Sequence, residues 1–178
     1  QKGKGLTGPD GKVVSHLTLI TPPAYYDTEA AATGKVIQGW LDAFGIPLSW
    51  NTIAFNSLLA RVKSKRDFDM FIMGWRGLSL DPDYLRRFFY SSPDSPNQWN
   101  YTGYNNAEFN KLADLQAETL DLKERRRIVL RLQEMLATDL PCIPLYIPHR
   151  MEGIRTDRFA GWVKQAGGVG NIWTFCML

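Results

Sequence analysis

The sequence predicts a single α/β domain over residues 1–178, with a mixed β-sheet and flanking helices. Segments with the composition of buried strands alternate with segments whose apolar residues recur at helical spacing. The first three segments follow in the order strand, helix, strand, which is typical of a βαβ unit with a parallel strand pair. Hydrophobic residues make up 44% and charged residues 22% of the chain, as in a folded globular domain.

The βαβ unit comes first in the chain. Segment 15–21, SHLTLIT, alternates apolar and polar residues as a strand does. Asp27 or Thr28 can cap the helix that follows, and Gly45 can end it. Residues 47–53 predict the second strand. The apolar positions of the helix recur at helical spacing and are Val36, Ile37, Trp40, Leu41 and Phe44.

A third strand lies between two short helical segments. Residues 56–65 predict a short helix, and the apolar run at 68–73 predicts a buried strand. Asp81 can cap a further helical segment over 82–90, with Pro82 at its first position.

A long loop, two helices and two strands complete the domain. Residues 91–105 are rich in Ser, Pro, Asn and Gly, and such loops with several aromatic residues typically bind or cover something. A helix is expected over 106–120. A second helix begins at Asp121, where Glu124 completes a capping-box pattern. Segment 142–148 and the end of the chain predict strands.

The charge of the chain does not indicate a nucleic-acid or membrane partner. The net charge of +3 results from 21 basic and 18 acidic residues. The run KERRRIVLR places four arginines on one helix, so a nucleic-acid-binding lobe is one hypothesis. Acidic residues lie within one or two helical turns of these arginines and favour ion pairs on a solvated helix face instead. No apolar run reaches the roughly 18 residues of a membrane-spanning helix.

Asp81 and Asp83 are candidates for acid–base chemistry or metal binding. Together with His149 they would serve a small α/β hydrolase-like or metal-assisted enzyme, which is the alternative function. Asp-Pro-Asp before a helix is more often a capped turn. The sequence has no nucleophile elbow, metal-ligand triad or glycine-rich phosphate loop. We therefore predict no catalysis, no metal and no cofactor.

The two cysteines, Cys142 and Cys176, fit no metal-ligand spacing. Both lie in apolar segments, so we expect two buried small residues. A disulfide between them is the alternative, provided that their strands are neighbours and the compartment is oxidising.

The sequence Gly-Trp-Arg-Gly at 74–77 follows the third strand directly. Open α/β sheets bind ligands at the carboxyl ends of their strands. Trp75 offers a flat apolar face, Arg76 a fixed fork of donors, and Gly77 allows close approach to the backbone. The alternative is that Trp75 packs into the core of its own domain.

Several motifs occur in a fixed order between residues 68 and 146: FDMFIMGW, then DPD, then GYNNAEFNKL, then LKERRRIVLRLQEMLATDLPCIPLY. In this order they resemble the extracytoplasmic solute-binding proteins of peptide-type ABC transporters, the family of dipeptide-, oligopeptide- and nickel-binding proteins. The resemblance covers nearly the whole chain.

This resemblance implies a periplasmic-binding-protein-like lobe without catalytic activity. The parent protein would have two lobes that close on a ligand. Residues 1–178 would be most of the second, C-terminal lobe, with the first lobe absent. The implied partners are a small solute such as a peptide or sugar, an ABC permease in the membrane, and the N-terminal lobe of the parent chain. The parent would be periplasmic or otherwise extracytoplasmic.

By the same resemblance, Trp75 corresponds to the aromatic residue at the cleft. In the peptide binders of the family, an aspartate three residues later pairs with the amino group of the ligand, and Leu78 stands at that position. The ligand's amine would need another carboxylate, such as Asp81 or Asp83, or the ligand would be anionic or uncharged. The predicted ligand-binding residues are Trp75, Arg76, Gly77, Leu78, Asp83, Tyr84, Trp99, Asn100 and Tyr104.

Overall fold

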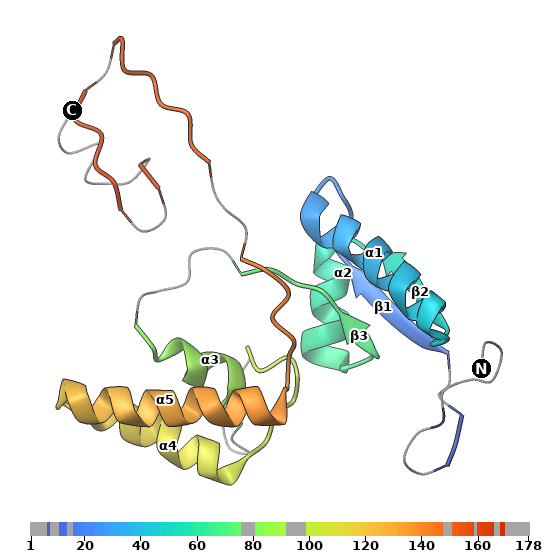
Figure 1. Ribbon diagram of the computed structural model, residues 1–178, viewed down its shortest axis with the longest axis horizontal. Coiled ribbons are helices and arrows are strands. Elements are labelled where there is room, and N and C mark those ends of the chain that lie inside the picture. The colour runs from blue at the N-terminus through green and yellow to red at the C-terminus, as the bar shows by residue number, and fades with distance from the viewer. Residues whose placement is uncertain are drawn as a thin grey trace. The chain divides into compact units, whose positions relative to one another are not determined.

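The computed structural model describes residues 7, 11–13, 16–75, 81–91, 99–147, 151–158, 160–165 and 168–169. The chain forms two compact units, 1–141 and 142–178, and each is described by itself. All nine helices and strands found in the described residues lie in the first unit (Figure 1). In chain order they are β1 (Leu17–Thr21), α1 (Thr28–Phe44), β2 (Leu48–Thr52), α2 (Phe55–Leu59), η1 (Ala60–Lys65), β3 (Met70–Phe71), α3 (Tyr84–Phe89), α4 (Ala107–Glu118) and α5 (Leu122–Asp139).

The sheet has three strands in the order β2-β1-β3. Both strand pairs are parallel, and Leu19 in the middle strand lies opposite Trp50 on one side and Met70 on the other. Helix α1 connects β1 to β2, which confirms the predicted βαβ unit. The sequence predicts a mixed sheet, whereas the three described strands all run parallel.

The predicted caps of α1 and α5 are confirmed, and α4 has a cap that was not predicted. The carboxylate of Asp27 accepts a hydrogen bond from the N–H of Ala30, and Gly45 ends α1 with a left-handed φ of 94°. Asn106 caps α4 through the N–H groups of Glu108 and Phe109. Asp121 caps α5 through the N–H of Glu124 at 2.8 Å.

Two of the shorter predicted elements differ in the structure. The helix expected over 56–65 is α2 followed by the π-helical turn η1, which ends at Arg66 with a left-handed φ of 49°. Helix α3 begins at Tyr84, two residues later than predicted. The Asp81 carboxylate accepts a hydrogen bond from the N–H of Asp83, and this bond forms a turn before the helix.

The strand predicted over 142–148 is wrong for its described part, because residues 142–147 form no strand. Proline lacks the N–H that a sheet ladder needs, and Pro144 divides this segment. Cys142 is exposed there, so its predicted burial is also wrong. Its possible partner Cys176, like the predicted final strand, lies outside the described residues.

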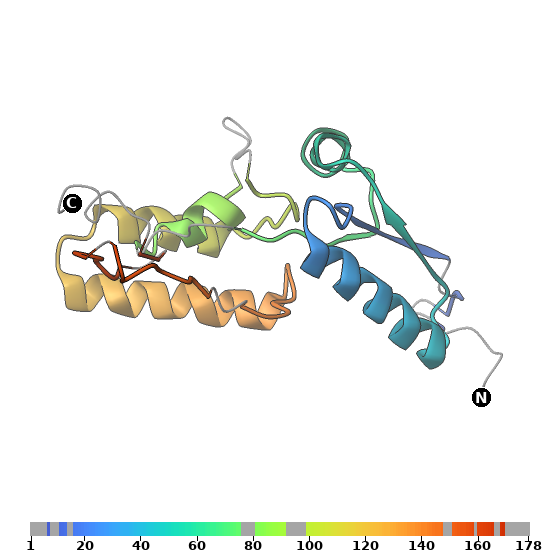
Figure 2. The same cartoon turned by 90° about the horizontal axis from the view of Figure 1, so that it is seen from above.

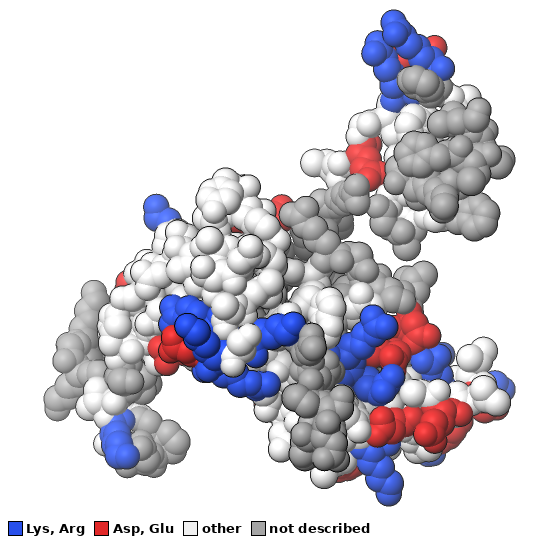
Figure 3. All heavy atoms as spheres, turned by 180° about the vertical axis from the view of Figure 1, so that it is seen from behind, with Lys and Arg blue, Asp and Glu red and all other residues white. Residues whose placement is uncertain are grey.

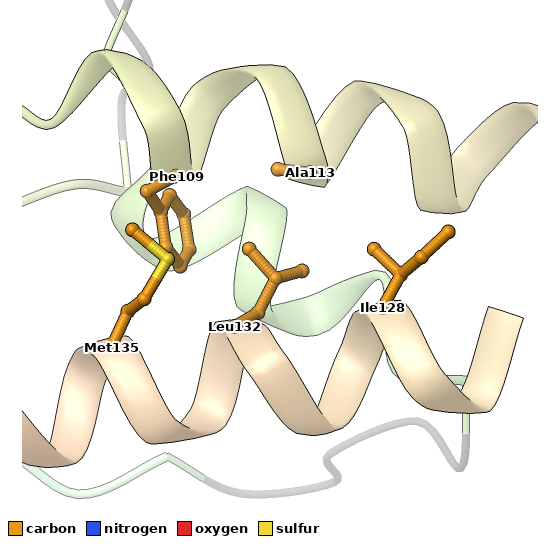
Figure 4. Packing of buried hydrophobic residues seen from close by; sticks show 5 residues of the cluster. All are labelled: Phe109, Ala113, Ile128, Leu132 and Met135. Atoms are coloured by element: carbon orange, nitrogen blue, oxygen red, sulfur yellow. The ribbon is translucent and has the colours of Figure 1, made fainter.

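The first unit has two hydrophobic clusters. One lies between α4 and α5, where Phe109, Ala113, Ile128, Leu132 and Met135 interdigitate (Figure 4). The other packs the sheet against α2 and η1 through Ile20, Leu58 and Val62, none of which is exposed. Figure 2 shows α4 and α5 side by side and antiparallel.

Helix α1 packs on the sheet through its small residues. Ala30, Ala31 and Gly34 are buried, whereas the larger Trp40 and Phe44 are 69% and 73% exposed. Small side chains let the helix axis approach the strands closely.

No helix in the described part of the chain is both long and apolar enough to cross a membrane.

We predict opposite effects of alanine at the two glycines inside α1. A Cβ at Gly34 would come within 2.8 Å of Thr21 Cγ2 and 2.9 Å of Trp50 Cδ1, whereas a Cβ at Gly39 would have no atom within 4 Å. Gly39→Ala should stabilise the fold by about 0.5–1 kcal/mol through helix propensity. Gly34→Ala should destabilise it by about 1–3 kcal/mol through overpacking. Urea unfolding of both variants measures the difference, and equal stabilisation would contradict the close packing of α1 on the sheet.

Candidate ligand-binding surface

Trp75 lies at the centre of a group of aromatic rings that come from three segments of the chain. Its ring centroid is 4.4 Å from that of Phe88 on α3, and 4.8 and 5.6 Å from those of Trp99 and Tyr101 in the loop before α4. Tyr84 contacts Phe88 at 5.3 Å. We call these five residues the aromatic cluster. Offset and edge-to-face contacts of this kind hold rings in preferred orientations.

The aromatic cluster is only half-buried. Trp75 is 37% and Trp99 46% exposed, and neither belongs to the two hydrophobic clusters. Tyr101 is less accessible, and burial raises the pKa of its hydroxyl. The alternative prediction, that Trp75 is buried in the core of its own domain, is therefore wrong. The cluster therefore exposes two indoles to solvent, that of Trp75 after β3 and that of Trp99 in the loop before α4.

Three predicted ligand-binding residues, Arg76, Gly77 and Leu78, lie outside the described residues. Trp75, Tyr84 and Trp99 are brought together in the aromatic cluster.

Asn100 has a different environment from the indole beside it. It is 4% exposed, and its amide nitrogen donates to the carbonyl oxygens of Phe89, Tyr90 and Tyr104 at 3.4, 3.2 and 2.8 Å. Its side-chain oxygen accepts from the Thr102 hydroxyl and the Tyr104 N–H. These contacts join the end of α3 to the loop that carries Trp99. A role of Asn100 in ligand binding stays a prediction.

Tyr104 also has internal partners. Its ring packs against Phe89 and Phe109, and its hydroxyl donates to Asp139 Oδ2 at 2.6 Å. Burial, followed by this hydrogen bond, raises the pKa of Tyr104 to about 12. The side chain thus connects the loop to the end of α5.

Asp81 and Asp83 are both engaged by arginines. Arg125 Nη2 lies 2.7 Å from Asp81, and Arg86 Nε lies 2.7 Å from Asp83. The N–H of Asp83, and then Arg125, hold the pKa of the Asp81 carboxyl below its usual range. An ionised, paired carboxylate is a poor general acid. Each aspartate thus already has a cationic partner within the chain.

These charged residues line an open groove of about 680 Å³ between α3 and the α4–α5 connection. Three arginines and two aspartates contribute to it, and Tyr84 belongs both to the groove and to the aromatic cluster. In Figure 3, basic and acidic side chains lie interspersed over the helical part of the first unit. Arg127 and Arg131 on α5 pair with Glu124 and Glu134, as the helix spacing predicts.

The alternative enzyme site has little support in this geometry. His149 lies outside the described residues. Among the residues that the structure describes, no group of three or more His, Cys, Asp or Glu side chains is placed to hold a metal ion.

Four residues at or beside the candidate surface were not predicted from the sequence. Phe88 and Tyr101 belong to the aromatic cluster, and Arg125 contacts both Asp81 and Gln116 of α4. Tyr84 and Phe88 are four residues apart on a helix, which is a signal for a shared face. Gln116 gave no signal, since a polar residue in an amphipathic helix is expected at the surface, yet it is 1% exposed.

Asn100→Asp should destabilise the fold by about 1–3 kcal/mol, because a carboxylate would replace the donor that faces three carbonyl oxygens. Asn105→Asp makes the same change at an exposed position of the same loop and should have little effect. Chemical unfolding at neutral pH measures both. Equal stabilities of the two variants would show that the Asn100 contacts do not hold the loop.

The phenol of Tyr104 should ionise near pH 12, about two units above an ordinary tyrosine. Its folded-state pKa is raised, so its stabilising contribution is complete below pH 10 and is lost as the pH rises towards 12. The difference in near-ultraviolet absorbance between the wild type and Tyr104→Phe, followed against pH, isolates this group. Ionisation near pH 10 would contradict the burial and the bond to Asp139, and Asp139→Asn should lower the pKa.

Curated proteins provide two informative relatives, and no protein-family model matches the chain. The oligopeptide-binding protein AppA of Bacillus subtilis is 31% identical over 148 residues, which cover 83% of this chain and 26% of AppA. The peptide transport periplasmic protein SapA of Haemophilus influenzae is 23% identical over 137 residues, covering 76% of this chain and 24% of SapA. The chain thus spans about a quarter of the length of these relatives.

Solved structures agree with the relatives. AppA of Bacillus subtilis, in complex with a nonapeptide, matches 79% of this chain and 27% of its own with a TM-score of 0.66 and 27% identity. A periplasmic oligopeptide-binding protein of Thermotoga maritima, bound to mannohexaose, matches 81% of this chain and 27% of its own with a TM-score of 0.67 and 25% identity. The predicted fold and resemblance are confirmed. In sequence and in fold, the chain is similar to a part of the peptide-binding proteins of ABC transporters.

Proposed function

We propose that this chain is part of the substrate-binding component of a peptide-type ABC transporter and contributes the aromatic cluster to its ligand site. The observation that carries the proposal is the half-exposed pair Trp75 and Trp99. The two rings lie in a chain whose relatives are named as peptide-binding and peptide-transport proteins. Large apolar faces with few rotatable bonds suit such a site, since little side-chain freedom is lost on binding.

The proposal extends to the parent protein. Residues 1–178 would form most of its C-terminal lobe, and an N-terminal lobe would supply the opposite wall of the site. A ligand held between the lobes makes contacts that exist only when they are closed, and therefore shifts the equilibrium towards the closed form. The closed form would be recognised by a membrane permease. The parent would act outside the cytoplasm, as the periplasmic relatives do, and would bind without catalysis.

The charges near the aromatic cluster support a choice of ligand class. Leu78 supplies no carboxylate for an amine, and Asp81 and Asp83 already pair with Arg125 and Arg86. We therefore favour recognition through the backbone and apolar faces of a peptide over recognition of its terminal amine. A sugar stacked on the indoles is the second candidate, favoured by the mannohexaose bound to the Thermotoga maritima neighbour.

The test follows the indole N–H signals of the 178-residue chain by NMR during titration with a mixed-sequence nonapeptide and, separately, with mannohexaose. Binding is expected in the millimolar range, because one lobe supplies only part of the enclosing surface. The signals of Trp75 and Trp99 should shift together, and Trp75→Ala should abolish the shift at Trp99.

Trp40 provides the matched control, since it is 69% exposed on α1 and has no part in the aromatic cluster. Its signal should not move, and Trp40→Ala should leave the titration unchanged. If Trp40 shifts as strongly as Trp75, or if neither ligand moves the Trp75 signal, this surface is not the ligand site.

A further inference from the structure

The turn before α3 is held by two side chains from the neighbouring helices. Gln116 on α4 is buried, and its amide nitrogen donates to Asp83 Oδ1 at 2.9 Å. Its side-chain oxygen accepts from Arg125 Nε of α5 at 3.1 Å. The same guanidinium reaches Asp81 Oδ1 through Nη2 at 2.7 Å. One glutamine and one arginine thus connect three helices.

Helix α3 depends on such anchors because it has only six residues. Helices of this length are not stable on their own, and their position is set by tertiary contacts. Its first turn also carries the pair between Arg86 and Asp83. These bonds fix where α3 starts and how it is rotated about its axis.

The rings of α3 in turn support the exposed indoles. Phe88 lies 4.4 Å from Trp75 and 5.9 Å from Trp99, with both ring pairs edge-to-face. Tyr84 stands beside Phe88 on the same helix. A shift or rotation of α3 would move these rings and change how the two indoles pack.

We propose that Gln116 and Arg125 are positioning residues of the aromatic cluster. They hold α3 so that Phe88 keeps Trp75 and Trp99 in one arrangement, although neither residue belongs to the cluster. For ligand binding this inference rests on the proposed function. A site whose side chains are ordered beforehand loses less conformational freedom on binding, so removing either residue should weaken binding roughly two- to tenfold.

The primary test does not need a ligand. Two indoles in contact give an exciton band in circular dichroism, and its loss in Trp99→Phe assigns the band to the pair Trp75 and Trp99. Arg125→Ala and Gln116→Met should each reduce this band towards that of Trp99→Phe, with the helical signal unchanged. Methionine has nearly the length of glutamine but makes neither of its hydrogen bonds, which suits a buried site.

Arg127→Ala is the matched control for Arg125→Ala. It removes the same charge from the same helix, but Arg127 pairs with Glu124 at an exposed position. The band should be unchanged in this variant. An unchanged band in folded Gln116→Met, or equal losses in Arg125→Ala and Arg127→Ala, would overturn the inference. If Arg125→Ala also loses helical signal, Gln116→Met decides.

Titration with the mixed-sequence nonapeptide separates this inference from the proposed function. Weaker binding by Gln116→Met and Arg125→Ala, but not by Arg127→Ala, supports both. If the wild-type Trp75 signal does not respond to peptide or sugar, the proposed function fails, while the exciton band still decides whether these residues position the cluster.

Discussion

The contacts of Trp75 with three other rings are the interaction on which the candidate surface depends. They join the segment after β3, helix α3 and the loop before α4, which are far apart in the sequence. Without them, the indole would be an isolated exposed side chain that loses rotational freedom on binding. With them, Trp75 stays 37% exposed and yet is packed on several sides.

The surroundings of the aromatic cluster show how an exposed apolar surface is kept in place. Hydrogen-bonded polar side chains beside the cluster hold its segments together. Asn100, the residue after Trp99, donates to three carbonyl groups, and Tyr104 connects the same loop to Asp139. No buried side-chain nitrogen or oxygen in the described residues lacks a hydrogen-bond partner. Satisfied polar networks of this kind specify one arrangement, because any other arrangement leaves buried groups unpaired.

The charges of the chain have a structural explanation. Arg125, Arg127 and Arg131 on α5 each lie against a carboxylate, and so does Arg86 on α3. Acidic side chains are therefore interspersed among the basic residues of α5. Two of these pairs engage the carboxylates of the candidate acid–base site, Arg125 with Asp81 and Arg86 with Asp83. Exposed pairs contribute little to stability. The partly buried contact of Arg125 with Gln116 is the one to which we assign the positioning of α3.

Local patterns in the sequence determined the βαβ unit, the three long helices and the caps of α1 and α5, since capping and periodicity are short-range properties. The motif order also indicated the resemblance to peptide-binding proteins of ABC transporters, and the sequence singled out Trp75, Tyr84 and Trp99. Only the tertiary structure decided that Phe88 and Tyr101 join them, that Asn100 and Tyr104 face inward, and that Gln116 is buried. It also decided that α1 packs through Ala30 and Gly34 and leaves Trp40 in solvent. The physical reason is that burial depends on which segments meet across long separations in the chain, and the spacing of residues along one segment does not contain that information.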